Sequence, residues 1–83
     1  MSDFANLDPG AVDAIQKLEA ELKAQGSDTV LVAYSGEVRL TLDEIILIQR
    51  LSPEALEMIQ KLEGELKDQN TYVALVAFKN DED

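Results

Sequence analysis

The sequence contains one thirty-residue pattern twice. Residues 7–36, LDPGAVDAIQKLEAELKAQGSDTVLVAYSG, align without a gap with residues 51–80, LSPEALEMIQKLEGELKDQNTYVALVAFKN, and fifteen of the thirty positions are identical. Substitutions between the copies keep a physical role, as where the aromatic Tyr34 is aligned with the aromatic Phe78. The alignment predicts that one supersecondary unit occurs twice in this chain.

The length and composition are those of one small folded domain. Of the 83 residues, 46% are hydrophobic and 29% are charged, which is more apolar material than a disordered segment carries. A chain this short has room for one core but not for a large enclosed active site. We expect a single domain over residues 1–83, with flexible ends at residues 1–6 and 80–83.

Each copy begins with the pattern of an amphipathic helix. The pairs Asp8-Pro9 and Ser52-Pro53 place a capping side chain before a proline at the first helical position. Apolar residues then recur at helical spacing, so one face of each helix is predicted to be buried. These faces consist of Ala11, Ile15, Leu18 and Leu22 in the first copy and Ala55, Ile59, Leu62 and Leu66 in the second.

Charged residues occupy the other side of both predicted helices. Four acidic residues each precede a lysine by four positions, a spacing that contributes about 0.2 to 0.5 kcal/mol per pair on a solvated helix. We interpret these charges as a solubilising outer surface. The pairs are Asp13–Lys17, Glu19–Lys23, Glu57–Lys61 and Glu63–Lys67.

A strand is predicted directly after each helix. Gly26 and Asn70 suit the left-handed conformation that ends a helix. Residues 29–34 and 71–78, which follow, are rich in β-branched and aromatic side chains. Both runs are apolar on both faces. If helices cover one face of the sheet, the other needs a second cover, either the segment between the copies or a second molecule.

The segment between the copies is predicted to begin with a strand. Residues 37–50, EVRLTLDEIILIQR, have no counterpart in the alignment beyond the short amino-terminal leader. Apolar and polar residues alternate over 37–42 after the turn signal Ser35-Gly36. This alternation predicts a hairpin strand that pairs with the strand of the first copy.

The second part of this segment carries a helix start. Thr41 and Glu44 form the T-x-x-E pattern of a capping box, which predicts a short helix through about Arg50. Because isoleucine favours sheet, a strand over residues 45–48 is the alternative prediction.

Together these elements predict an α+β fold in the order helix, strand, strand, short helix, helix, strand. A pseudo-twofold axis normal to the sheet would place the two repeated strands antiparallel and side by side, with the hairpin strand flanking the first. The expected fold is an internally duplicated helix–strand unit whose small three-stranded antiparallel sheet is packed by helices.

The charge of the chain narrows the classes of partner. A formal net charge of −10 at pH 7 opposes binding to a nucleic acid backbone or to an anionic membrane surface. No apolar run approaches the roughly 20 residues that span a bilayer, and the amino terminus lacks the pattern of a signal peptide. We expect a soluble, cytoplasmic protein without nucleic acid or membrane partners.

The chain offers little for catalysis. It contains no cysteine and no histidine, which removes thiol chemistry, thiolate zinc sites and the usual general base. Its four glycines form no phosphate-binding motif. The near-adjacent carboxylates fall on predicted solvated faces. We therefore predict no catalytic, cofactor or metal site, and a role other than that of an enzyme.

Apolar residues without an assigned place in a core suggest a binding role. We expect a non-catalytic protein–protein interaction or regulatory module, whose partner is a second copy in a homodimer or a basic protein. The candidate interface residues are Ile45, Ile46, Ile48, Tyr72 and Val76. The alternative is a small-ligand or cation-binding protein that uses surface carboxylates.

Overall fold

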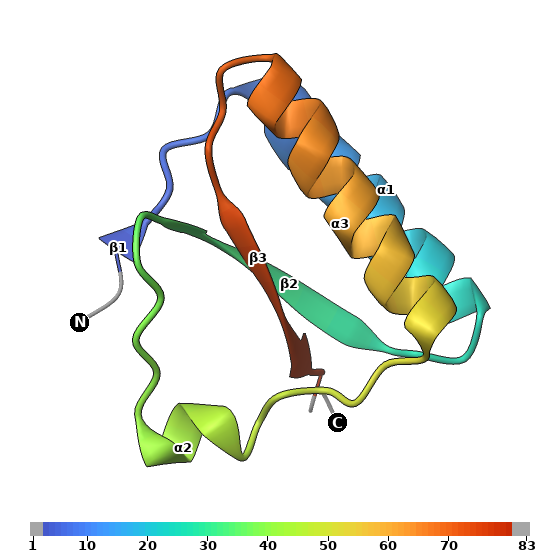
Figure 1. The fold of residues 1–83 in the computed structure, drawn as a ribbon. Coiled ribbons are helices and arrows are strands. Elements are labelled where there is room, and N and C mark those ends of the chain that lie inside the picture. Colours follow the sequence, from blue (N-terminus) through green and yellow to red (C-terminus); the bar gives the residue numbers. More distant parts are fainter. Residues whose placement is uncertain (1–2, 81–83) are drawn as a thin grey trace.

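Two long helices lie side by side on one face of an antiparallel sheet in the computed structural model, which describes residues 3–80 (Figure 1). The strand order in the sheet is β1-β2-β3. The predicted α+β class and the small three-stranded antiparallel sheet are confirmed. In chain order the elements are β1 (Asp3–Phe4), α1 (Pro9–Ala24), β2 (Thr29–Ser35), α2 (Leu42–Ile45), α3 (Pro53–Asp68) and β3 (Ala74–Lys79).

The long helices begin and end at the residues that the sequence predicts. The side chains of Asp8 and Ser52 accept hydrogen bonds of 2.8 and 3.1 Å from the backbone N–H three residues later. Each helix then runs for 16 residues from a proline. Just beyond the two helices, Gly26 and Asn70 have φ of 96° and 65°, the left-handed conformation that closes a helix.

The core lies between these helices and the sheet. All eight apolar residues predicted for the helix faces are buried, each 7% exposed or less. Burial of one leucine or isoleucine contributes roughly 1.5 to 3 kcal/mol to stability. The sheet contributes alternate residues of its two long strands to this core, Leu31 and Ala33 of β2 and Leu75 and Ala77 of β3.

Strands β2 and β3 form the centre of the sheet. They pair antiparallel, and Val32 lies opposite Val76. These two valines are aligned with each other in the sequence repeat. The centre of the ladder therefore joins two corresponding positions of the two copies.

The predicted hairpin strand over residues 37–42 is wrong. Residues 37–41 form no strand, and Leu42 begins α2. The third strand is instead β1, which pairs antiparallel with the end of β2, and Ala5 N–H donates a hydrogen bond of 3.0 Å to the Ala33 carbonyl. Because a strand has only two edges, β1 and β3 leave no position beside this end of β2 for residues 37–41.

The short helix begins as predicted and ends early. Thr41 Oγ1 accepts a hydrogen bond of 3.2 Å from the Glu44 N–H, and Glu44 Oε1 accepts one of 2.9 Å from the Thr41 N–H. The capping box is therefore confirmed. The helix ends at Ile45 and not near Arg50.

Helix α2 stops at Ile45 because the residues that follow, 47–49, pair with the sheet. Ile48 forms a single antiparallel β-bridge with Phe78, at the edge of β3 away from β2. Residues 47–49 lie beside β3 in the same way that residues 3–5 lie beside β2. Each of these two segments precedes the helix that follows it by the same number of residues. The hydrogen bonds that flank the bridge are Gln49 N–H to Ala77 C=O at 2.9 Å and Lys79 N–H to Leu47 C=O at 2.7 Å.

Flexible ends are predicted at residues 1–6 and 80–83. Residues 1, 2 and 81–83 lie outside the described residues. Within the described part, Asp3–Phe4 is paired in the sheet, and the Asn80 side chain donates a hydrogen bond of 3.1 Å to the Asp28 carboxylate.

Candidate functional site

The face of the sheet away from α1 and α3 is apolar. Alternate residues of β2 and β3 belong to the helix-packed core, so the residues between them point to the other face. Paired positions in β1 and in residues 47–49 extend this face, because partners in an antiparallel ladder share a side. The resulting open sheet face consists of Phe4, Val30, Val32, Tyr34, Ile48, Ala74, Val76 and Phe78.

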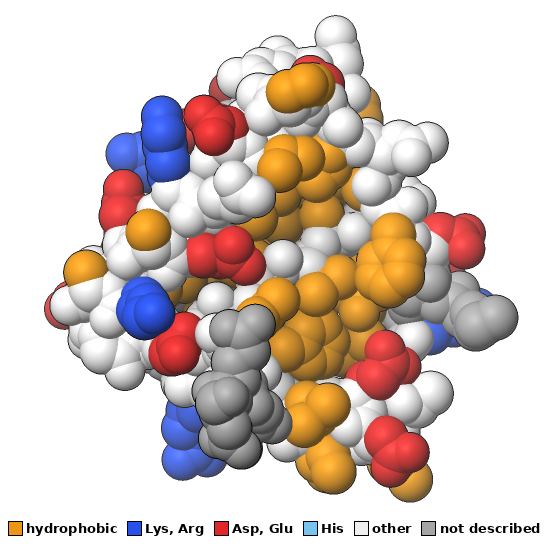
Figure 2. Space-filling model, turned by 180° about the vertical axis from the view of Figure 1, so that it is seen from behind, with side chains coloured by type: hydrophobic (Ala, Val, Ile, Leu, Met, Phe, Trp, Pro, Cys, Tyr) orange, Lys and Arg blue, Asp and Glu red, His pale blue; other side chains and the backbone are white. Residues whose placement is uncertain are grey.

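No residue of the open sheet face is charged, and a large part of it reaches solvent. Phe4 is 75% exposed, and Val30 and Ile48 are each 39% exposed. Figure 2 shows hydrophobic side chains gathered in the middle of the view from behind, over the strands, with charged side chains around them. The half-buried members of the face are Val32, Ala74, Val76 and Phe78.

The two ends of the open sheet face are covered unequally. Tyr34 is only 3% exposed, and its ring stacks on Phe4 with centroids 5.6 Å apart. Burial, and next the negative charge of Glu44, raise the pKa of the Tyr34 hydroxyl. Phe78, which is aligned with Tyr34, is half-buried, and its pairing partner Val30 is exposed. Among the described residues, Phe4 therefore covers the Tyr34 end of the face, whereas the Phe78 end is flanked along the edge of β3 by Leu47 and Ile48 and keeps Val30 exposed.

Residues 42–47, termed the α2 segment, present a second apolar surface. They lie on the side of the sheet away from α1 and α3 (Figure 1). Single exposed apolar residues are common on proteins, but four within six positions are not. The exposed residues are Leu42 at 81%, Ile45 at 48%, Ile46 at 70% and Leu47 at 42%.

The structure separates the five candidate interface residues into three places. Ile48 and Val76 belong to the open sheet face, and Ile45 and Ile46 belong to the α2 segment. Tyr72 is 64% exposed and precedes β3, where it lines a hollow of about 320 Å³ against α3. It is therefore not part of either apolar surface, and a binding role for any of the five stays a prediction.

Of the exposed residues of the open sheet face, sequence reasoning identified Ile48 and missed Phe4 and Val30. Phe4 belongs to the leader, and only its pairing with Tyr34 brings it to this face. Val30 was part of a predicted strand, but its side depends on the register with β3.

The outer edges of the two central strands each carry a helix carboxylate. Glu19 Oε2 accepts a hydrogen bond of 2.7 Å from the Leu31 N–H, and Glu63 Oε2 accepts one of 2.7 Å from the Leu75 N–H. Both glutamates are half-buried and aligned in the repeat. The solvated role predicted for them is therefore wrong, because each satisfies a backbone donor at a sheet edge.

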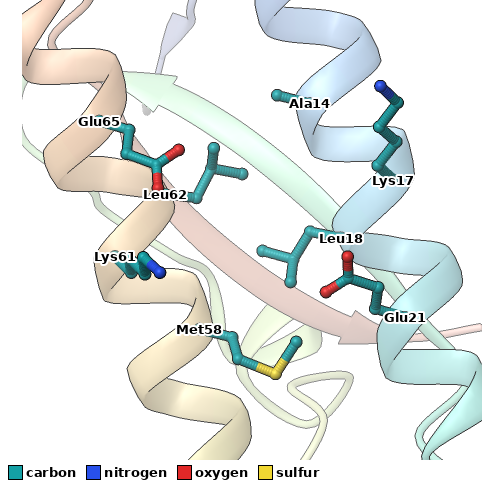
Figure 3. Close-up of a pocket in the computed structure, with 8 residues that line it drawn as sticks. All are labelled: Ala14, Lys17, Leu18, Glu21, Met58, Lys61, Leu62 and Glu65. Carbon is teal, nitrogen blue, oxygen red and sulfur yellow. The ribbon is translucent and has the colours of Figure 1, made fainter.

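A groove of about 440 Å³ lies between α1 and α3 (Figure 3). The helices run antiparallel, and Figure 3 shows a lysine of one helix across from a glutamate of the other at two levels along the groove. Its volume falls within the range of small-molecule sites. The lining residues are Ala14, Lys17, Leu18 and Glu21 from α1 and their aligned counterparts Met58, Lys61, Leu62 and Glu65 from α3.

The described part of the chain contains neither a cluster of metal-binding side chains nor a membrane-spanning helix. Among residues 3–80, no three acidic side chains gather where they could hold a metal ion. No helix in the same range combines the length and the hydropathy needed to cross a membrane.

Comparisons with protein-family models, with curated proteins and with solved structures give no match. The function of this α+β domain has to be inferred from three surface features. These are the uncharged open sheet face, the apolar α2 segment and the groove between α1 and α3.

Proposed function

We propose that this chain is a non-catalytic protein–protein interaction module that binds through its open sheet face. The observation that carries the proposal is an uncharged sheet face with Phe4, Val30 and Ile48 between 39% and 75% exposed. A monomeric domain normally covers both faces of an apolar sheet. Extended apolar patches on soluble proteins usually mark interaction sites.

The proposal includes the absence of catalysis and of a cofactor. It is supported by the lack of histidine and cysteine, which leaves lysine, carboxylates and tyrosine as the available acid–base groups. It also includes a cytoplasmic location, which fractionation of cells that express a tagged chain would test.

We also infer that the two sequence copies fold as equivalent units, each with an edge segment, a helix and a central strand. Corresponding contacts of the two copies support this inference, and Val32 opposite Val76 would then mark the axis between them. The open sheet face would have two equivalent ends, of which the chain covers one. The corresponding hydrogen bonds are Glu19–Leu31 with Glu63–Leu75 and Ala5–Ala33 with Gln49–Ala77.

The substitution Val30→Asp tests the proposed interaction face, and Val12→Asp is its matched control. Val30 is 39% exposed on the open sheet face, whereas Val12 is 38% exposed on α1. A charge on the face should remove association, because the partner would have to bury it unpaired. Amide spectra establish that each variant is folded. Light scattering then detects self-association, and quantitative affinity capture from cell extract detects foreign partners.

Two results bear on the proposal. Loss of association in Val30→Asp, with Val12→Asp unchanged, supports an interaction face on the sheet. A folded Val30→Asp variant that keeps every association of the wild type overturns it.

The groove between α1 and α3 favours small-ligand binding as a second candidate function. It combines an apolar floor that includes Leu18 and Leu62 with charged side chains of both signs at its walls. Amide shifts followed during titration with calcium and with small apolar ammonium or carboxylate compounds test this candidate. Saturable shifts at the groove residues would support it, and their absence at millimolar ligand would exclude it.

A further inference from the structure

We infer that the partner of the open sheet face is a second copy of this chain. The two copies face each other across a twofold axis, and the α2 segment of each packs on the Val30–Phe78 end of the other's sheet. This partner assignment rests on the proposed function and deepens it.

The sheet edges are poor places for a partner. Beside β2, Ala5 bonds to the strand and Glu19 accepts the next outward N–H, that of Leu31. Beside β3, residues 47–49 and Glu63 fill the corresponding positions. Because these outward groups already have partners, a second copy gains little by extending the sheet at either edge. The open sheet face, unlike these edges, still exposes apolar side chains to solvent.

The uneven cover of this face defines where the second copy fits. Tyr34 at one end of the face is buried under Phe4 and lies near Glu44. At the other end, Val30 is exposed and Phe78 is half-buried, and among the described residues Leu47 and Ile48 flank this end along the edge of β3. A twofold axis parallel to the sheet and perpendicular to its strands brings the covered end of one copy over the open end of the other. Each α2 segment then contacts both sheets, and the interface is isologous, as in most homodimers.

The two surfaces that meet in this arrangement are chemically alike. Leu42 and Ile46 of the α2 segment are 81% and 70% exposed, so most of their surface is available to a second copy. The opposing end of the partner's face presents Val30, Ile48 and Phe78, none of which is charged. Apolar side chains therefore meet apolar side chains, Glu44 stays in its capping box, and the exposed Asp43 has to remain in solvent at the margin of the contact.

The available area is close to what a stable dimer uses. If a fully exposed large apolar residue is counted at roughly 150 to 250 Å², the range for aromatic side chains, the exposed fractions of Phe4, Val30, Ile48 and the four apolar residues of the α2 segment correspond to at most about 600 to 1,000 Å². A standard interface buries about 800 Å² on each partner.

The net charge distinguishes a second copy from a basic protein. Each copy carries a formal charge of −10, so two copies repel each other through residues outside the uncharged face. Added salt screens this repulsion and strengthens a homodimer. The same salt weakens a complex with a basic partner, because it screens an attraction.

Absolute molar mass by light scattering tests the dimer over a concentration series at low and high salt. We expect twice the chain mass of 9.2 kDa, with tighter association at high salt. Ile46→Asp and Val30→Asp should each raise the dissociation constant at least about tenfold, and Val12→Asp should leave it unchanged. Ile46→Asp keeps the test valid if Val30→Asp does not fold, because Ile46 is outside the core.

Disulfide formation between introduced cysteines tests whether Ile46 of one copy lies close to Val30 of the other. The chain has no cysteine, so introduced thiols react without background. The double variant Ile46→Cys with Val30→Cys should form covalent dimers on mild oxidation, and denaturing mass analysis separates these from intrachain links. Ile46→Cys with Val12→Cys is the matched control and should form few.

The outcomes separate this inference from the proposed function. A wild type that stays monomeric at millimolar concentration overturns the homodimer. If Val30→Asp then removes binding of a foreign protein, the interaction face stands with another partner. If neither self-association nor partner binding responds to Val30→Asp, both the inference and the proposed function are wrong. A dimer that resists Ile46→Asp and forms no 46–30 disulfide overturns the arrangement.

Discussion

Glu19 and Leu31 are joined by a hydrogen bond of 2.7 Å between the carboxylate Oε2 and the backbone N–H, and the aligned Glu63 and Leu75 are joined in the same way at 2.7 Å. Each bond ties a helix to the strand that follows it. Each also satisfies a strand donor that faces away from the centre of the sheet. Stability and protection of the sheet edge thus depend on the same two carboxylates.

Replacement of Glu19 or Glu63 by alanine should lower the free energy of unfolding by about 1 to 2 kcal/mol, since a bond to a half-buried charged acceptor is lost. Glutamine retains an acceptor oxygen and should cost less. Urea unfolding followed by circular dichroism measures these differences. Glu21→Ala and Glu65→Ala, exposed on the same helices, should stay within about 0.5 kcal/mol of wild type. Equal losses at positions 19 and 21 would contradict a specific role for the bond.

The two aligned helix segments differ at a glycine, and this difference predicts a stabilising change. Gly64 lies inside α3, where an added Cβ meets no atom within 4 Å, and its counterpart in α1 is Ala20. Gly64→Ala should raise the free energy of unfolding by about 0.5 to 1 kcal/mol. A loss of stability would instead show that this position of α3 requires a residue without a side chain.

Gly26→Ala should have the opposite effect on the same measurement. Gly26 has φ of 96°, a conformation that side chains with a Cβ rarely adopt. Although nothing lies within 4 Å of the added Cβ, the backbone strain should lower the free energy of unfolding by about 1 kcal/mol. Comparison with Gly64→Ala separates backbone strain from helix propensity, since neither position is crowded.

The parts of the fold that were predictable are those set by neighbouring residues. Asp8 and Ser52 lie three positions from the amide groups that they cap, and Gly26 and Asn70 close the helix turns beside them. The buried faces follow from spacing within one helix. These features do not depend on where other elements lie, so residue type and spacing suffice to predict them.

The features that were missed depend on which edge or face another element occupies. Residues 37–41 alternate like a strand, but β1 already occupies that edge of β2. The short helix ends at Ile45 because the edge of β3 accepts residues 47–49. Glu19 has the spacing of a solvated acid, and only the position of β2 makes it a backbone acceptor.

The membership of the open sheet face likewise depends on how distant parts of the chain pair. Val76 and Ile48 were chosen for their apolar character, and the register places both on the open sheet face. Phe4 joins that face through pairing with a residue thirty positions away. Such a long-range pair leaves no local signal in the sequence.

The hydroxyl of Tyr34 should ionise above its ordinary pKa of 10.0, because burial and then the charge of Glu44 disfavour the phenolate. The chain has two tyrosines, so Tyr72→Phe leaves Tyr34 alone for an absorbance titration. In that background Glu44→Gln should lower the pKa, since one cause of the shift is removed. Asp43→Asn, which changes the adjacent charge, should move it less.

The raised pKa of Tyr34 also predicts the alkaline dependence of stability. The unfolded chain loses the phenol proton at a lower pH than the folded chain does. The contribution of this group is therefore fully present below pH 10 and is lost as the pH rises through the raised pKa of the folded protein. Urea unfolding at a series of alkaline pH values, compared with Tyr34→Phe, isolates this loss. A folded-state titration at or below the ordinary value would show that water reaches the hydroxyl.

The capping box of α2 should control local opening and not global stability. Thr41 Oγ1 accepts the Glu44 N–H, and α2 buries none of its own residues. Thr41→Ala removes a cap worth about 1 kcal/mol, so the amides of Glu44 and Ile45 should exchange about fivefold faster with solvent. The urea midpoint should change little, and Thr41→Ser, which keeps the hydroxyl, should resemble wild type. A large fall in the global midpoint would mean that α2 unfolds only with the core. The α2 segment would then be a fixed part of the domain, already held in the position from which it can reach a second copy.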